Sequence, residues 1–287
     1  MLISEIYKTT KKKLDNFNIE TSEIDARVII KNIFGCTDKE LIMNNKISFS
    51  KKENDLLSKV ISERLSGKPL SRIFGTKEFF SMDFVINKYV LDPRPDSEIL
   101  VEEALGYIKE NNFKFILEFG VGSGCIIGGI LKNSEEVYAL GVDISEKAIS
   151  TAKVNLLKNN ISNFDLVVGD WGSCINKKFD LIVSNPPYIK SSDIKNLANE
   201  VKEHDPLLSL DGGYDGLQCY RVIADQSSSL LDDEGYVIVE IGYDQANHVG
   251  QIFADSGFLL MNKVKDISKL DRVLIFKKKK IKKIVEI

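Results

Sequence analysis

A glycine-rich segment between a predicted strand and a predicted helix could hold a small ligand. It reads Glu118-Phe119-Gly120-Val121-Gly122-Ser123-Gly124. Glycines in such a turn allow a ligand to approach the backbone closely. A dinucleotide fingerprint would be G-x-G-x-x-G, but residue 125 is a cysteine. The segment therefore fits a nicotinamide dinucleotide poorly, and a plain tight turn is the alternative.

Acidic residues after the next two predicted strands favour a ligand of the adenosine type. Asp143 follows a strand predicted at 137–142, where a carboxylate can accept hydrogen bonds from a ribose diol. We expect Ser145 to cap the following helix, which would leave Asp143 free for the ligand. After the third strand, Asp170-Trp171 could accept from an exocyclic amine and pack on a purine. A position in the core is the alternative for this tryptophan, the only one in the chain.

The segment Asn185-Pro186-Pro187-Tyr188 follows a strand predicted at 181–183 and could bind a planar NH₂ group. The prolines stiffen the turn and carry no N–H donors, so their carbonyl oxygens are available as acceptors. The oxygen of the Asn185 side chain is a further acceptor. A stiff structural loop is the alternative, but it leaves the asparagine unexplained.

The elements that position these segments alternate between strand and helix. Beyond the strands named above, the pattern predicts a helix over 145–157 and strands at 115–119, 164–168, 236–241, 259–264 and 272–276. Such alternation is typical of a mostly parallel α/β sheet with helices on both faces. The last two strands are predicted to form an antiparallel hairpin. All the candidate segments would then lie at the carboxyl ends of strands, where open sheets bind their ligands.

The first 75 residues read as a small helical bundle. Ser22 with Asp25 predicts a helix cap, and capping boxes are predicted for Thr37 with Glu40 and for Ser50 with Glu53. Alternating apolar residues then predict a β-hairpin between Glu78 and Leu91, and the segment 92–96, with two prolines, breaks it.

Composition narrows the classes of function. The 287 residues carry a net charge of −3, which argues against a general nucleic-acid coat. We expect the basic run Lys277–Lys283 to be a solvated tail. The four cysteines lack the spacing of a zinc site or a disulfide framework, so we expect no metal and a reduced, cytoplasmic location. No signal peptide is expected, and no apolar stretch approaches the roughly 18 residues of a membrane span.

Together, the glycine loop, Asp143 and the Asn185–Tyr188 turn resemble class I S-adenosylmethionine-dependent methyltransferases that act on amino nitrogens. Three further stretches are similar to the HemK/PrmC family: Arg94-Pro95-Asp96-Ser97-Glu98, Phe179-Asp180-Leu181-Ile182-Val183-Ser184 and Leu210-Asp211-Gly212-Gly213-Tyr214-Asp215-Gly216-Leu217. The chain departs from the family's pattern at Asp92, at Ser97, where threonine is usual, and at His204-Asp205-Pro206.

The resemblance implies an enzyme that methylates the side-chain amide of the Gln in the Gly-Gly-Gln motif of class I peptide chain release factors. It implies a helical substrate-recognition domain over 1–75, a β-hairpin linker over 76–95 and a Rossmann-like methyltransferase domain over 96–287. No direct DNA binding and no membrane contact are expected.

The resemblance also assigns residues. The S-adenosylmethionine site would comprise Glu118, Gly120, Val121, Gly122, Ser123, Gly124, Asp143, Asp170, Trp171 and Asn185. Asn185, Pro186 and Tyr188 would be catalytic, and Asn185, Pro186, Pro187, Tyr188 and Arg94 would bind the substrate. For Arg94 the alternative is an ion pair with Glu98 that holds the linker. No general base is evident, because His204 and His248 are candidates by residue type alone.

The sequence leaves two rival functions open. An N6-adenine or N2-guanine methyltransferase acting on nucleic acid would use the same acceptor turn, but it predicts a basic face and a base-reading insertion. A non-catalytic nucleotide-binding protein of the same fold predicts a broken acceptor turn, whereas Asn185–Tyr188 is intact.

Overall fold

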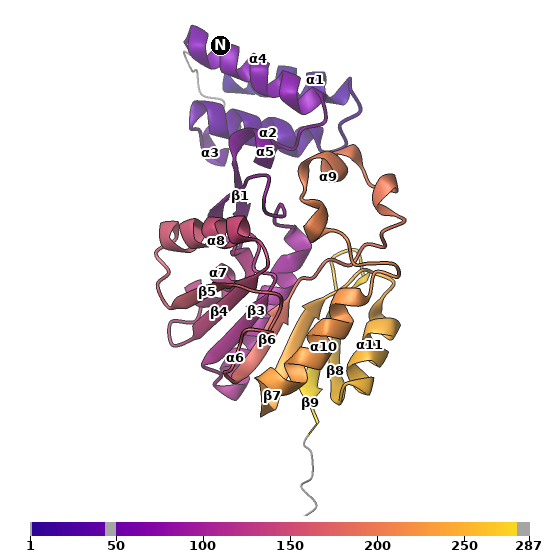
Figure 1. Cartoon of the computed structure of the whole chain (residues 1–287). Coiled ribbons are helices and arrows are strands. Elements are labelled where there is room, and N and C mark those ends of the chain that lie inside the picture. The colour runs from indigo at the N-terminus through magenta and orange to yellow at the C-terminus, as the bar shows by residue number, and fades with distance from the viewer. Residues whose placement is uncertain (1, 44–49, 280–287) are drawn as a thin grey trace, which may run out of the picture. The chain divides into compact units, whose positions relative to one another are not determined.

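The computed structural model describes residues 2–43 and 50–279 (Figure 1). The chain divides into two compact units. The smaller unit comprises Met1–Thr76 and Asn199–His204, and the larger unit comprises Lys77–Ala198 and Asp205–Ile287. The predicted hairpin thus groups with the larger unit, and a short segment from late in the chain groups with the smaller one. Among the described residues, no helix is long and apolar enough to cross a membrane.

The smaller unit consists of helices packed around one apolar core. They are α1 (Ile3–Asp15), α2 (Ser22–Phe34), α3 (Asp38–Ile42), α4 (Lys51–Leu65), α5 (Leu70–Phe74) and α9 (Asn199–His204). Both predicted capping boxes are confirmed. The Thr37 and Ser50 hydroxyls accept the N–H groups of Glu40 and Glu53, whose carboxylates accept the cap N–H groups in return.

The predicted cap at Ser22 is wrong. Helix α2 has Thr21 as its N-cap, without a side-chain cap bond, and the Ser22 hydroxyl donates instead to Asp15. Asp25 is drawn into an ion pair with Arg64, at 2.6 Å from Nε to Oδ2. The Arg64 side chain is 5% exposed and also reaches Glu200 of α9. A buried guanidinium needs carboxylate partners, so Asp25 pairs with Arg64 rather than capping the helix.

The larger unit contains the remaining elements. Its helical segments are η1 (Pro95–Ser97), α6 (Glu98–Asn111), α7 (Cys125–Lys132), α8 (Glu146–Lys158), η2 (Ile194–Asn196), η3 (Leu207–Ser209), α10 (Gln218–Leu230) and α11 (Ala246–Asp255). Its strands are β1 (Thr76–Phe79), β2 (Met82–Val85), β3 (Phe115–Phe119), β4 (Tyr138–Asp143), β5 (Phe164–Val168), β6 (Phe179–Ser184), β7 (Leu231–Glu240), β8 (Phe258–Lys265) and β9 (Asp271–Lys278). Strands β1 and β2 form a hairpin as predicted, but it spans 76–85 rather than 78–91, and residues 86–91 are not in a strand. Its turn residues Phe80 and Ser81 have φ of 49° and 59°.

A seven-stranded sheet forms the centre of the larger unit. Its strand order is β5-β4-β3-β6-β7-β9-β8. Strands β3 to β7 pair in parallel, and β9 pairs antiparallel to both β7 and β8, as predicted for the C-terminal hairpin. The connections from β3 lead to β4 on one side, and β6 lies on the other. Such a reversal opens a crevice beyond the carboxyl end of β3, where ligands bind in open α/β sheets.

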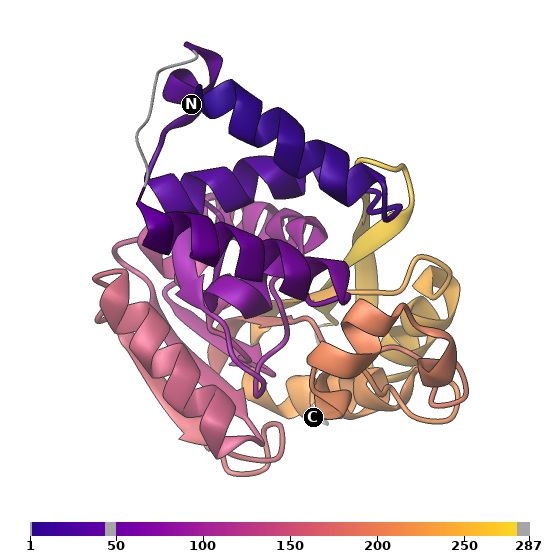
Figure 2. The ribbon, with the colours of Figure 1, turned by 90° about the horizontal axis from the view of Figure 1, so that it is seen from above.

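Helices cover both faces of the sheet, which explains its long apolar runs. Successive residues of β3 point to opposite sides: Ile116 belongs to the core under α6, α7 and α8, and Leu117 to the core under α10 and α11. Figure 2 shows α8 toward one end of the sheet and α10 and α11 toward the other. The two cores hold the carboxyl ends of β3, β4, β6 and β7 at one edge.

The basic run was predicted to be a solvated tail, and this is wrong for its first residues. Lys277 and Lys278 belong to β9. The Lys277 ammonium lies 2.7 Å from the Glu234 carboxylate, and that of Lys278 donates to the carbonyl of Leu231. Pairing with β7 and these contacts extend the strand. Residues 280–283 of the run lie outside the described residues.

Candidate active site

The glycine loop is held in a left-handed backbone conformation at the end of β3. Gly120, Gly122 and Gly124 have φ of 72°, 52° and 79°. The N–H groups of Gly120 and Val121 both donate to the carbonyl of Val142 at the end of β4, at 2.8 and 3.0 Å. A Cβ at Gly124 would lie 3.1 Å from that of Ala152 in α8, so the loop needs glycine there for space as well as conformation.

Asp143 contacts the loop directly. Its two carboxylate oxygens accept the N–H groups of Gly122 and Ser145, each at 2.9 Å. Ser145 does cap α8, as predicted, because its hydroxyl accepts the Ala148 N–H. The expectation that this cap frees Asp143 is wrong, because the same turn directs the Ser145 N–H at the carboxylate. Each oxygen retains a second lone pair for a ligand, and burial raises the pKa of the carboxyl.

A cavity of about 410 Å³ lies at this edge of the sheet. Most of the predicted site residues line it: Arg94, Glu118, Gly120, Val121, Gly122, Ser123, Asp143, Asp170, Trp171, Asn185 and Pro187. Gly124, Pro186 and Tyr188 do not belong to its lining among the described residues. These residues come from five segments. Four of the segments follow strands β3, β4, β5 and β6 of one parallel sheet, and the fifth holds Arg94, just before η1.

Glu118 lies beneath the loop. It is 1% exposed, and its carboxylate accepts the N–H of Ile127 in the first turn of α7 at 3.0 Å. Burial raises its pKa well above the usual value. A carboxyl group at the amino end of a helix accepts otherwise unpaired N–H groups, so Glu118 fastens the loop to the helix that follows it.

Trp171 lies in the cavity wall in an unusual backbone conformation. Its φ is 52°, which is uncommon for a bulky residue. The indole packs edge-on against Phe119, with ring centroids 6.0 Å apart. The next N–H, of Gly172, donates to the Gln226 side chain. The neighbouring Asp170 is exposed at the cavity, so one wall presents both an aromatic plate and a carboxylate.

The acceptor turn leaves the sheet directly after β6. The Ser184 hydroxyl donates to the carbonyl of Phe119, which ties β6 to the start of the glycine loop. Asn185 and Pro187 line the cavity. The Tyr188 side chain packs against the core under α10 and α11, and burial raises its pKa to about 12. Its carbonyl accepts from the Gln245 amide at 3.0 Å.

The ion pair with Glu98 that was the alternative for Arg94 is wrong. The Arg94 guanidinium forms an ion pair with Asp205, whose side chain is 3% exposed. Glu98 accepts the N–H of Phe80 at 2.8 Å. Arg94 nevertheless belongs to the cavity lining, so its exposed part is available at the cavity mouth.

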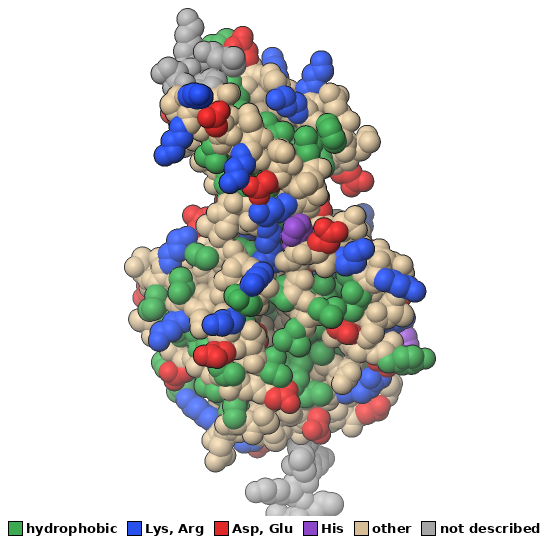
Figure 3. Space-filling view, turned by 45° about the horizontal axis from the view of Figure 1, so that its top comes forward, with side chains coloured by type: hydrophobic (Ala, Val, Ile, Leu, Met, Phe, Trp, Pro, Cys, Tyr) green, Lys and Arg blue, Asp and Glu red, His purple; other side chains and the backbone are tan. Residues whose placement is uncertain are grey.

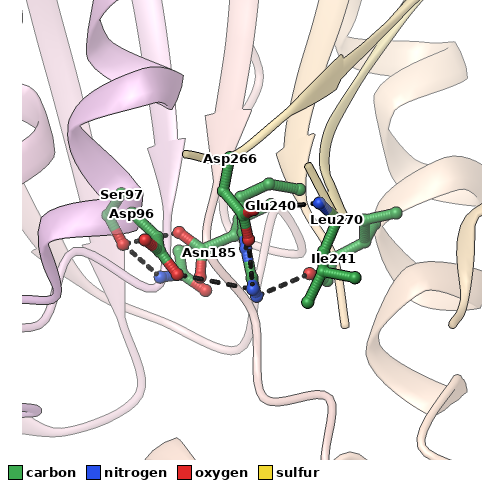
Figure 4. A network of polar contacts seen from close by, with 8 residues as sticks. Asp96, Ser97, Asn185, Glu240, Ile241, Asp266 and Leu270 are labelled. Carbon is green, nitrogen blue, oxygen red and sulfur yellow. Dashed lines mark hydrogen bonds and ion pairs between the residues drawn. The ribbon is translucent and has the colours of Figure 1, made fainter. Parts of the chain in front are cut away.

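Sequence reasoning missed a buried network behind Asn185 (Figure 4). The Asn185 amide nitrogen donates to the Ser97 hydroxyl at 3.0 Å, and that hydroxyl donates to the Glu240 carboxylate. Arg272 of β9 lies close by, in ion pairs with Asp96 and Asp266. The sequence did contain one signal of this network, Glu240, which interrupts the otherwise apolar run 236–241. An isolated acid in a buried strand needs a partner.

Models of two protein families match the chain. "PrmC N-terminal domain" matches residues 5–75, and "Methyltransferase small domain" matches residues 94–208. A solved methyltransferase from Pyrococcus furiosus is 17% identical, with a TM-score of 0.53 over 77% of this chain and 99% of that one. This likeness confirms the predicted Rossmann-like methyltransferase fold.

Two curated relatives are more similar in sequence. The "Bifunctional methyltransferase" of Rickettsia bellii is 34% identical over 91% of this chain, which spans only 52% of that protein. The "Release factor glutamine methyltransferase" of Agrobacterium fabrum is 38% identical over 93% of this chain and 94% of its own length. With near-complete coverage in both directions and both family models in order, the chain belongs to the HemK/PrmC family of release factor glutamine methyltransferases.

Proposed function

We propose that the protein transfers a methyl group from S-adenosylmethionine to the side-chain amide nitrogen of the Gln in the Gly-Gly-Gln motif of class I peptide chain release factors. The observation that carries this proposal is the position of Asn185, which lines the same cavity as the glycine loop and Asp143. An acceptor for amide N–H groups therefore lies beside a site suited to an adenosine-type cofactor.

The residues of the cavity suit S-adenosylmethionine. Gly120, Gly122 and Gly124 would accommodate its methionine part, and the unused lone pairs of Asp143 would accept from the ribose hydroxyls. Asp170 and Trp171 would lie at the adenine. Glu118, another predicted cofactor residue, supports the loop from beneath. When bound, the cofactor supplies a sulfonium-activated methyl group, and the protein's contribution is to place and hold the acceptor nitrogen.

The acceptor turn would overcome the weak nucleophilicity of an amide. The nitrogen lone pair is delocalised into the carbonyl, so attack builds positive charge on the N–H groups. The Asn185 side-chain oxygen and the Pro186 carbonyl would accept those two N–H groups and stabilise that charge. Holding the nitrogen in line with the methyl carbon, about 3–3.5 Å away, supplies the remaining advantage.

Other parts of the chain would select the substrate. Pro187 and Tyr188 would support the Gln side chain, and Arg94 would contact the factor near the cavity mouth. The helices of residues 1–75 would grip the factor at a distance from the reacting atom, with 76–95 as the linker, because one Gln must be chosen among many. A cytoplasmic location follows from a substrate that acts in translation termination.

A nucleic-acid substrate is less well supported. Such an enzyme would need a basic face for the phosphate backbone. On the face drawn in Figure 3, basic and acidic side chains of the larger unit are interspersed around a group of apolar ones. We therefore also propose that the protein does not bind DNA directly.

Transfer of labelled methyl groups tests the proposal. The acceptors are a purified class I release factor, the same factor with the Gly-Gly-Gln glutamine changed to Ala, and bulk DNA. We expect label on the unchanged factor alone. Asn185→Ala should lower kcat by roughly 10²–10³-fold, as loss of one transition-state hydrogen bond does in other enzymes. The control is Asn111→Ala, an exposed asparagine at the end of α6. Label on DNA and none on the factor would refute the proposal.

A further inference from the structure

We propose that Ser97 and Glu240 are positioning residues that fix which end of the Asn185 side-chain amide faces the cavity. This inference rests on the proposed function, in which the oxygen of that amide accepts an N–H of the substrate. Neither residue was singled out from the sequence as part of the site, and neither needs to touch the substrate to act.

The three side chains meet from three different elements. Ser97 lies just before α6, Asn185 just after β6, and Glu240 at the end of β7 (Figure 4). Strands β6 and β7 pair in parallel, with Ser184 opposite Val239. The residues that follow, Asn185 and Glu240, therefore leave the sheet at the same level. The position of the asparagine is consequently set by the register of the central sheet.

The direction of the hydrogen bonds follows from the charge of Glu240. An ionised carboxylate can only accept, so the Ser97 hydroxyl must use its single proton to donate to it. The Ser97 oxygen is then left with lone pairs only, and it accepts from the Asn185 amide nitrogen at 3.0 Å. The Asn185 amide lies near the Glu240 carboxylate as well and lowers the pKa of that carboxyl. The contact with the Ser97 oxygen directs the NH₂ end of the amide at Ser97, which lines the cavity wall beside Asn185, whereas Glu240 does not belong to the lining.

The other end of the amide is the end that the reaction needs. Asn185 lines the cavity, so when its NH₂ end turns inward its oxygen is left for the ligand. The opposite orientation would set two NH₂ groups against each other, which gives no hydrogen bond and no stabilisation of developing charge. An isolated asparagine has no strong preference between the two orientations, so the enzyme needs a device that selects one.

The charged groups around Glu240 bear on its ionisation. Arg272 of β9 favours the carboxylate form, whereas the nearby Asp96 opposes it. Tyr188 of the acceptor turn and Tyr220 of α10 also face this region, and the Tyr220 hydroxyl donates to the Glu240 backbone carbonyl. The Cys125 thiol of α7 is a further neighbour, and the carboxylate helps to raise its pKa.

Burial dominates this balance and raises the pKa of Glu240 to about 7. A protonated Glu240 becomes a donor, which allows the Ser97 hydroxyl to turn and donate to the asparagine oxygen. The amide is then no longer held in one orientation. Activity that depends on this network should therefore fall as the pH drops through about 7, because the ionised form is the active one.

Two serine variants and a matched control separate positioning from stability. Ser97→Ala removes the relay and should lower kcat up to about a hundredfold, the effect of a small misplacement of a reacting group. Its KM for the release factor and its affinity for S-adenosylmethionine should stay close to those of the wild type. Ser97→Thr keeps a hydroxyl and should restore most of kcat. The control Ser227→Ala alters a buried hydroxyl of α10 that has no partner among the described residues, and it should leave kcat unchanged.

The pH profile tests the part played by Glu240. In the wild type, kcat should fall on the acid side of about pH 7. Glu240→Gln cannot ionise, so it should show a lower kcat without that acid limb. A Glu240→Gln variant that retained the wild-type acid limb would overturn the assignment. A Ser97→Ala variant with unchanged kcat would also overturn it. So would a folded Ser97→Thr variant whose kcat stays as low as that of Ser97→Ala.

Nuclear magnetic resonance of the Asn185 side-chain amide makes the inference independent of activity. Its two N–H signals are assigned by their loss in Asn185→Ala. The signal of the N–H that donates to Ser97 should be protected from exchange in the wild type and unprotected in Ser97→Ala. Protection in a wild type that methylates no release factor would refute the proposed function and leave the geometry standing. Unprotected signals in the wild type would refute the positioning role, whatever the substrate.

Discussion

Replacing Gly124 with alanine tests whether the glycine loop is limited by space as well as by backbone conformation. At a φ of 79° an alanine is strained by about 1–2 kcal/mol. Its Cβ would also lie 3.1 Å from the Cβ and 3.2 Å from the Cα of Ala152 in α8. The second of these is a backbone atom, so the loop or α8 must move. Overpacking of this kind costs about 1–3 kcal/mol more.

The chain offers a matched control in the same unit. Gly257 has a φ of 88°, but a Cβ there would meet no atom of the described residues within 4 Å. Gly257→Ala should therefore lose only the stability that follows from the positive φ, about 1–2 kcal/mol. The free energy of unfolding should fall by about 1–3 kcal/mol more in Gly124→Ala than in Gly257→Ala.

Urea denaturation followed by the fluorescence of Trp171 measures this difference. Trp171 is the only tryptophan and lies in the larger unit, so its signal reports on the unit that both variants change. Calorimetric titration with S-adenosylmethionine should show weaker binding for Gly124→Ala alone, because its loop must shift. Equal unfolding free energies and equal affinities in the two variants would refute the steric argument.

Two further predictions concern buried charges. Arg64→Leu leaves the carboxylate of Asp25 buried without its partner and should lower the stability of the smaller unit by about 3–5 kcal/mol, measured by hydrogen exchange of α2 and α4 amides. Lys59→Ala, in an exposed pair on the same helix, should change it by about 1 kcal/mol or less, and similar losses in both variants would contradict the reasoning. The raised pKa of Glu118 means that its contribution to stability is present below its unfolded pKa and is lost as the pH rises through its folded pKa. Between about pH 5 and 8, urea unfolding should therefore show the wild type losing stability relative to Glu118→Gln, and a constant difference would argue against a buried, ionising Glu118.

Local patterns predicted the elements well wherever one short segment determines the outcome. The strands at 115–119 and 164–168 have the predicted bounds, and both capping boxes formed. In these cases the deciding interactions lie within a few residues of each other. Strand β7 begins at Leu231, five residues earlier than predicted, because Leu231 pairs with Phe179 of β6, and sequence alone does not reveal that partner.

The site was predicted only in part, because only some of its deciding interactions lie within one short segment. The glycine loop and Asn185 carry their chemistry in their residue types, so their places at strand ends revealed them. The relay through Ser97 and Glu240 joins residues 143 positions apart, and Asp143 is engaged by a backbone N–H that no pattern marks. Asp25 similarly pairs with the buried Arg64 instead of capping helix α2 as predicted. Interactions of this kind are decided by packing, which local sequence does not encode.

The sheet order has a consequence for how the enzyme is made. Glu240 ends β7, and Arg272, whose charge lowers the pKa of Glu240, belongs to β9, the strand that must insert between β7 and β8. A nascent chain that has emerged only as far as the acceptor turn holds Asn185 without the carboxylate that orients it. With the role proposed for Glu240, catalytic competence would arrive only after β9 has left the ribosome, and shorter nascent chains would be inert toward the release factor.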